Sequence, residues 1–140
     1  VGQQLDLAAE GRSISSEELV NIHRNKTGAL IGFSAEAGAM IGGADSEELR
    51  TVSEFSERLG LLFQIKDDLL DVTQTTEELG KTAGKDIASS KATFPSLRGI
   101  DETNRLAEKV HSEVVEAIGR LNRPAELLVR IADFILTRSS

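Results

Sequence analysis

The 140-residue chain has no cysteine, tryptophan or tyrosine, and only two prolines and one methionine. Without cysteine it can form no disulfide, no iron–sulfur cluster and no zinc site of the cysteine type. Its 16 basic residues are outnumbered by 23 acidic ones, for a net charge of −7. A nucleic-acid-binding protein needs a basic surface and often aromatic rings for stacking, so the composition argues against that class.

Long hydrophobic runs are also lacking. The most apolar stretch, residues 29–44, is interrupted by Glu36 and falls short of the roughly 20 residues that span a membrane. No basic segment followed by an apolar run marks a secretory signal. The two histidines, His23 and His111, are too far apart in sequence to suggest a ligand pair. We expect one soluble, acidic domain of ordinary globular composition.

Helical periodicity extends along nearly the whole chain, and no stretch alternates with period two for long enough to form a sheet. The predicted class is therefore all-α. Three segments begin with a capping residue followed three positions later by glutamate, namely Ser15 with Glu18, Asp45 with Glu48 and Thr75 with Glu78. The first predicted elements are helices over 19–43 and 49–72, a short turn capped by Thr75, and a loop over 80–93. A short helix from Pro95 and a helix over 102–121 follow. The last predicted helix has Pro124 in its first turn and ends near Arg138.

Glycines recur in the first of these helices, at Gly28, Gly32, Gly38 and Gly42. Residues four apart lie on one helix face, so these positions would let another backbone approach closely. Each glycine weakens a helix interior by roughly 1 kcal/mol relative to alanine. We therefore expect tertiary packing to hold this helix, as a buried member of a bundle. Helical periodicity is already present at Val1, so we expect the chain to be part of a longer protein.

One segment of the second long helix gathers polar side chains. At about 100° per residue, Gln64, Asp67, Asp68 and Asp71 fall within one arc that apolar residues border on both sides, while Lys66 projects away from it. Like charges four residues apart repel each other on a helix. A divalent cation would remove that repulsion, and Mg²⁺ suits a site with few carboxylates, several waters and substrate phosphates. The alternative interpretation is an ordinary solvated acidic face, and the apolar residues on both sides of the arc argue against it.

The sequence also has lysines that could bind an anion. Lys81, Lys85 and Lys91 lie in the expected loop, and Lys26 with Thr27 stands in a mostly apolar helical context. Lysine ammonium groups suit phosphate oxygens. Ordinary surface charge explains the loop lysines equally well, but Lys26 must either extend to solvent or face a polar cavity. Acidic and basic groups together suggest a diphosphate held by Mg²⁺.

Five motifs and the closing segment now indicate a family. They are GQQLDL at 2–7, HRNKTGAL at 23–30, GLLFQIKDDLLDVT at 60–73, EELGKTAGKD at 77–86, KATFPSLRG at 91–99 and ADFILTRS at 132–139. Their order and spacing resemble those of the trans-isoprenyl diphosphate synthases, and most of all the short-chain geranylgeranyl and farnesyl type. The resemblance covers only the C-terminal half of such an enzyme.

The resemblance implies a role for each matching residue. Asp67, Asp68 and Asp71 match the second aspartate-rich motif, which binds Mg²⁺ bridging to the allylic diphosphate. Thr27 and Gln64 match polar groups that stabilise the developing allylic cation.

Further residues match groups around the diphosphate. Lys26 and Lys81 match lysines that hold the departing diphosphate, so Lys26 counts among the catalytic residues together with Thr27 and Gln64. Lys91 matches another lysine near the diphosphate pocket. Gln3 and Asp6 match a pair that lines the same cavity.

For the whole protein, the resemblance implies an antiparallel helical bundle around an apolar cavity. The implied reaction is Mg²⁺-dependent head-to-tail condensation of isopentenyl diphosphate with an allylic diphosphate, in a homodimer. Residues 1–140 would form the C-terminal part of one prenyl synthase domain, without the first aspartate-rich motif, and would be inactive alone. The expected location is the cytoplasm, or a plastid if a transit peptide has been removed.

A different interpretation treats the chain as a non-catalytic partner subunit or as a relative of the terpene cyclases with the same fold. Acidic motifs are often degraded in partner subunits of this family, whereas DDLLD at 67–71 is intact. The intact motif favours the synthase.

Overall fold

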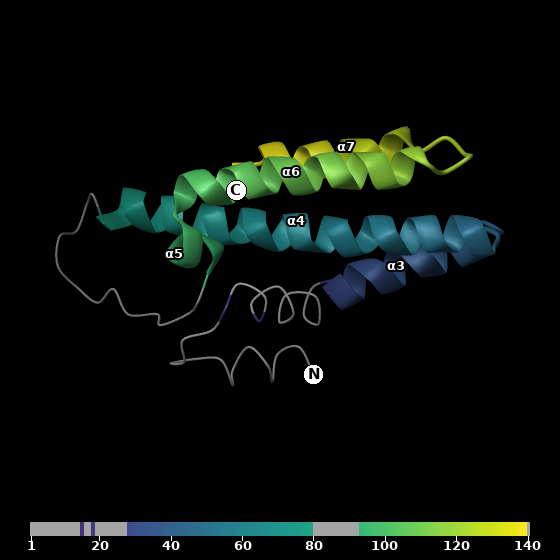
Figure 1. Ribbon diagram of the computed structural model, residues 1–140, viewed down its shortest axis with the longest axis horizontal. Coiled ribbons are helices and arrows are strands. Elements are labelled where there is room, and N and C mark those ends of the chain that lie inside the picture. The colour runs from purple at the N-terminus through teal and green to yellow at the C-terminus, as the bar shows by residue number, and fades with distance from the viewer. Residues whose placement is uncertain (1–14, 16–17, 19–27, 80–92, 140) are drawn as a thin grey trace.

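The computed structural model describes residues 15, 18, 28–79 and 93–139. These residues form the helices α3 (Ala29–Ile41), α4 (Ser46–Leu79), α5 (Phe94–Arg98), α6 (Ile100–Gly119) and α7 (Glu126–Thr137). No strand occurs within the described ranges, and the all-α prediction is confirmed. In Figure 1, α4 runs through the middle, α3 lies along one side of it, and α6 and α7 lie along the other, with successive long helices antiparallel.

The hydrophobic core lies between α4, α6 and α7. Phe55, Leu62 and Ile65 of α4 are at most 1% exposed, and they pack in one cluster with Val114 and Ile118 of α6. The apolar residues of α6 recur every three or four positions, so one face of that helix is buried and the other is solvated. The core therefore fixes the position of α4, which contains the acidic segment.

Helix α4 is continuous over 34 residues, or about 50 Å at 1.5 Å per residue. Its cap at Asp45 was predicted correctly, and the helix begins at Ser46, three residues before the predicted range. Asp45 Oδ1 accepts the N–H groups of Glu47 and Glu48 at 2.8 and 2.9 Å, and Glu48 Oε2 accepts the N–H of Asp45 at 2.9 Å. The same reciprocal pair joins Ser15 and Glu18.

The third capping prediction was wrong. Thr75 lies inside α4, which runs without a break to Leu79. Within a helix that is already formed, the carbonyls of the preceding turn satisfy the backbone N–H groups after position 75, so no side-chain cap is needed. No glycine or proline occurs between Gly60 and Gly80 to interrupt the helix.

The C-terminal elements match the predictions with shifted boundaries. Thr93 caps α5 by accepting the Ser96 N–H at 3.3 Å, and Pro95 lies in its first turn. Gly99, with φ of +83°, separates α5 from α6, and α6 begins at Ile100, two residues earlier than expected.

Pro124 was expected in the first turn of α7 but precedes that helix. Ala125 is the N-cap, because its carbonyl accepts the first helical N–H groups, from Leu128 at 2.9 Å and from Val129 at 3.1 Å. The end of α7 at Thr137, next to Arg138, agrees with the prediction.

Helix α3 is not buried within the described part of the chain, although its glycines predicted a buried helix. No residue of α3 is fully buried, and Phe33 and Ile41 are 72% and 90% exposed. Close backbone approach does occur at its first turn, where a Cβ built on Gly60 would lie 2.9 Å from Gly28 Cα. At Gly38 no atom lies within 4 Å of such a Cβ. Glycine spacing indicates a face that allows contact, but it does not show that a neighbour covers that face.

In the described part of the chain, no helix combines the length and the apolar character needed to cross a membrane.

Candidate functional site

The candidate site is centred on the acidic segment of α4. Gln64 and Asp68 lie one turn apart and are buried, with exposed fractions of 7% and 8%. Asp67 and Asp71 form a second pair one turn apart on a neighbouring strip of the helix. The Asp67 side chain is 40% exposed, and Asp71 is exposed. The polar arc therefore has a buried edge and an edge that is open to solvent.

Asp68 is held by α5. The backbone N–H of Phe94 donates to Asp68 Oδ2 at 2.9 Å, although the two residues are 26 positions apart. Phe94 itself is 1% exposed and belongs to the core. This contact stabilises the N-terminus of α5 against α4 and fixes one aspartate of the segment.

Asp67 is held by the C-terminal residues. Arg138, which directly follows α7, donates from Nη2 to Asp67 Oδ1. The guanidinium carbon of Arg138 lies 4.5 Å from the ring centroid of Phe63, one helical turn before Asp67. This geometry is that of a cation–π contact. Asp67 and Asp68, although adjacent in sequence, are thus bonded to opposite ends of the C-terminal part of the chain.

Two aspartates of the acidic arc are hydrogen-bonded to protein groups, Asp67 to Arg138 and Asp68 to the Phe94 N–H. Among the side chains that the structure describes, no group of three or more histidine, cysteine or acidic residues is arranged to hold a metal ion. The negative charge of Asp67 is instead balanced by Arg138, and that of Asp68 is stabilised by a backbone N–H. The proposed roles of Asp67, Asp68 and Asp71 as metal ligands remain predictions.

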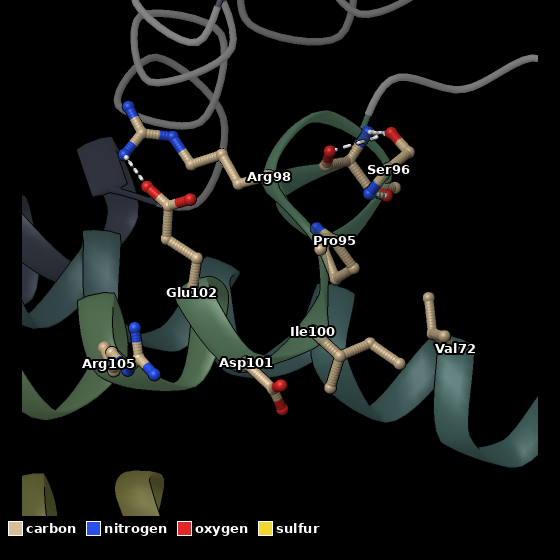
Figure 2. A pocket seen from close by; sticks show the side chains of 10 residues that line it. Val72, Pro95, Ser96, Arg98, Ile100, Asp101, Glu102 and Arg105 are labelled. Carbon is tan, nitrogen blue, oxygen red and sulfur yellow. Dashed lines mark hydrogen bonds and ion pairs between the residues drawn. The ribbon is translucent and has the colours of Figure 1, made fainter.

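An open groove of about 860 Å³ borders the acidic segment. It is lined by Val72, the residue after Asp71, by α5 and by the first turns of α6. Figure 2 shows Val72 on one side of the groove and the Arg98–Glu102 ion pair, at 3.6 Å, on the other. Two arginines and two acidic residues line this groove, so it has no strong charge of one sign.

The other predicted site residues lie outside the described ranges. They are Gln3, Asp6, Lys26, Thr27, Lys81 and Lys91. The nearest described neighbour of the Lys26–Thr27 pair in sequence is Gly28, which contacts Gly60 one turn before Gln64. The structure therefore brings together Gln64, Asp67, Asp68 and Asp71 and leaves the remaining assignments as predictions.

Sequence reasoning missed two contributors to the site, Arg138 and the backbone N–H of Phe94. Arg138 lies in the ADFILTRS segment that contributed to the family resemblance, and an arginine just after the last helix of an acidic chain was the only available signal. A contact across 71 positions is not visible in local periodicity.

The chain is similar to known proteins of one family. The family model for polyprenyl synthetase matches residues 1–128. The chain is 45% identical to a chloroplastic geranylfarnesyl diphosphate synthase of Leucosceptrum canum, over 98% of this chain and 39% of that protein. It is 41% identical to a chloroplastic geranylgeranyl pyrophosphate synthase of Catharanthus roseus, over 99% of this chain and 40% of that protein.

A solved structure shares the fold. The geranyltransferase of Helicobacter pylori, solved with magnesium and isoprenyl diphosphate, superposes with a TM-score of 0.74 at 32% identity, over 96% of this chain and 44% of that one. The chain thus spans about two fifths of the length of the curated relatives it matches. With the family model matching more than half of its residues, the chain belongs to the polyprenyl synthetase family.

Proposed function

We propose that the whole protein containing this chain is a Mg²⁺-dependent prenyltransferase. It would join isopentenyl diphosphate head to tail with an allylic diphosphate and release a short-chain product of the geranylgeranyl or farnesyl class. The family assignment and the diphosphate synthase names of the relatives support this activity. Those relatives also favour the synthase over a non-catalytic subunit or a cyclase-like protein.

The observation that carries the proposal is the open edge of the acidic arc. Asp67 and Asp71 lie one turn apart with solvent access, beside the buried amide of Gln64. Carboxylate oxygens at this spacing match the ligand chemistry of Mg²⁺, which takes one or two carboxylates and completes its shell with waters and phosphates. Asp67, Asp68 and Asp71 would hold the ion, with Asp68 already oriented by the Phe94 N–H.

The bound ion would supply positive charge to the diphosphate oxygens. Lys26, Lys81 and Lys91 would add ammonium groups around the same diphosphate and stabilise it as the allylic C–O bond breaks. Gln64 and Thr27 would direct oxygens toward the allylic carbon that becomes positive.

The next steps need positioning and little acid–base chemistry. The double bond of isopentenyl diphosphate attacks the allylic carbon, a new C–C bond forms, and one proton is lost. Holding both substrates in line is therefore a large part of the catalysis. Gln3 and Asp6 would line the same cavity.

The domain organisation is also proposed. Residues 1–140 would be the C-terminal part of one prenyl synthase domain whose other part carries the first aspartate-rich motif. The exposed apolar side chains of α3 and α7 support this, among them Phe33 and Phe134 at 72% and 66% exposed. The rest of the domain would cover them, and the complete protein would form a homodimer.

The expected location is the cytoplasm, or a plastid for a protein with a transit peptide. The chloroplastic names of both plant relatives support the plastid alternative.

The test is Asp67→Ala in the full-length protein. Incorporation of labelled isopentenyl diphosphate into an allylic diphosphate should fall by about 100-fold or more, because an oriented metal ligand is lost. Glu116→Ala, which removes an exposed carboxylate from α6, is the control and should keep near-normal turnover. Near-normal activity of Asp67→Ala would refute the assignment of this segment to the metal, and product analysis of the native protein would give the chain length.

A further inference from the structure

The contact between Arg138 and Asp67 has two features that a purely structural ion pair does not need. The Arg138 side chain is only 14% exposed, whereas its partner Asp67 is 40% exposed. Arg138 Nε is buried and has no hydrogen-bond partner. A guanidinium paired with a carboxylate usually forms two parallel bonds, and a buried N–H without an acceptor is unfavourable.

The position of Asp67 explains why a cation is nevertheless favourable there. Asp67 and Asp71 are like charges one helical turn apart, and a positive group beside Asp67 relieves their repulsion. Phe63 provides a ring on which the guanidinium stacks at 4.5 Å. Arg138 therefore places a positive charge beside Asp67, at the expense of its own Nε–H.

Mg²⁺ at this segment would meet the same requirement with better ligand chemistry. A guanidinium within contact distance of Asp67 repels a divalent ion bound to the same carboxylate. We propose that Arg138 competes with the divalent cation for Asp67, so that metal binding at α4 and docking of the C-terminal residues on α4 oppose each other. This inference rests on the proposed metal role of Asp67.

Thermodynamic linkage makes the opposition reciprocal. If docking of Arg138 weakens metal binding by a given factor, then metal binding weakens docking of Arg138 by the same factor. The Arg138 Nε–H, now buried, would then become accessible to water. The C-terminal residues after α7 would report on metal occupancy, although they lie 71 positions from Asp67 in sequence.

The experiment compares metal affinity in full-length variants without diphosphate, using Mn²⁺ and the EPR signal of the free ion. Arg138→Gln should bind Mn²⁺ more tightly than wild type, on the order of tenfold, because a competing positive charge is removed. Arg130→Gln is the matched control, since it removes an exposed arginine two turns earlier on α7 and changes net charge equally. Its affinity should stay at the wild-type value.

Equal or weaker Mn²⁺ binding by Arg138→Gln would overturn the competition. If that variant does not fold, the ¹⁵Nε–H resonance of Arg138 in the wild-type protein decides. Exchange with water that becomes faster at saturating Mg²⁺ supports the competition, and an unchanged resonance overturns it. Asp67→Asn separates the two proposals: Mn²⁺ binding at wild-type affinity in that variant would refute the metal site itself.

Discussion

The backbone N–H of Phe94 donates a 2.9 Å hydrogen bond to Oδ2 of Asp68, and this bond joins the start of α5 to the acidic segment of α4. Both residues are buried. An aspartate that the sequence presents as one of three equivalent carboxylates is therefore also a structural anchor. Its substitution should affect stability as well as chemistry.

Asp68→Ala should lower the free energy of unfolding by about 1–3 kcal/mol, because the buried Phe94 N–H loses this acceptor. Asp68→Asn keeps a side-chain oxygen that can accept the bond, and it should lose clearly less. Urea unfolding of the full-length protein, followed by circular dichroism, measures both. Equal losses for the alanine and asparagine variants would show that the bond is not what Asp68 contributes to stability.

Local signals in the sequence predicted what local contacts determine. The Asp45–Glu48 capping box joins residues three apart, so the sequence predicted the cap of α4 correctly. The same pattern at Thr75 failed because a cap competes with a helix that is already formed there. Whether a capping pattern marks the start of a helix therefore depends on whether the residues before it are already helical.

Contacts between distant segments were not predictable in this way. Periodicity placed Asp67 and Asp68 on one arc, but it could not show that Arg138 would reach one and the Phe94 N–H the other. The predicted burial of α3 is likewise not seen within the described residues. An apolar, glycine-rich helix indicates a face suited to packing, and the rest of the chain decides whether that face is covered.

Gly60 is the second position where a single substitution should be informative. A Cβ at Gly60 would lie 2.9 Å from Gly28 Cα, so Gly60→Ala must push α3 away from α4. We expect a loss of about 1–3 kcal/mol in unfolding free energy, as for overpacked cores. Gly38→Ala is the control, because nothing lies within 4 Å of its Cβ and alanine should stabilise the helix by about 0.5–1 kcal/mol. Thermal or urea unfolding distinguishes the two, and a stabilised Gly60→Ala would contradict the contact.

The turn between α3 and α4 should make stability depend on pH in acid. Arg123 donates to the carbonyls of Gly42 and Gly43, each at 3.1 Å, and to Glu48 Oε2 at 2.8 Å. The hydrogen bond from Arg123 lowers the pKa of Glu48, and backbone N–H groups, first that of Glu48, lower the pKa of Asp45.

A carboxyl whose pKa is lowered by folding stabilises the protein above its ordinary pKa and loses that contribution as pH falls through the lowered value. Glu48→Gln should therefore be less stable than wild type near neutral pH, and the difference should shrink below roughly pH 4, where a glutamate carboxyl becomes protonated. Unfolding free energies measured at several pH values test this, with Glu116→Gln on α6 as the control. A difference that stays constant down to strong acid would contradict the prediction.

The last prediction concerns the apolar faces of α3 and α7. Phe33 and Ile41 of α3 and Phe134 of α7 are 72%, 90% and 66% exposed, and large exposed apolar side chains promote association. The 140 residues expressed alone should therefore associate as concentration rises, bind a hydrophobic dye and show no prenyl transfer.

Phe33→Ser should weaken that association by removing one large apolar side chain. In the full-length protein the same substitution should instead lower stability, because the rest of the domain would cover Phe33. Sedimentation velocity across a concentration series measures the first effect, and thermal unfolding measures the second. A monodisperse monomer of residues 1–140 that melts cooperatively and turns over substrate would show that these faces need no partner.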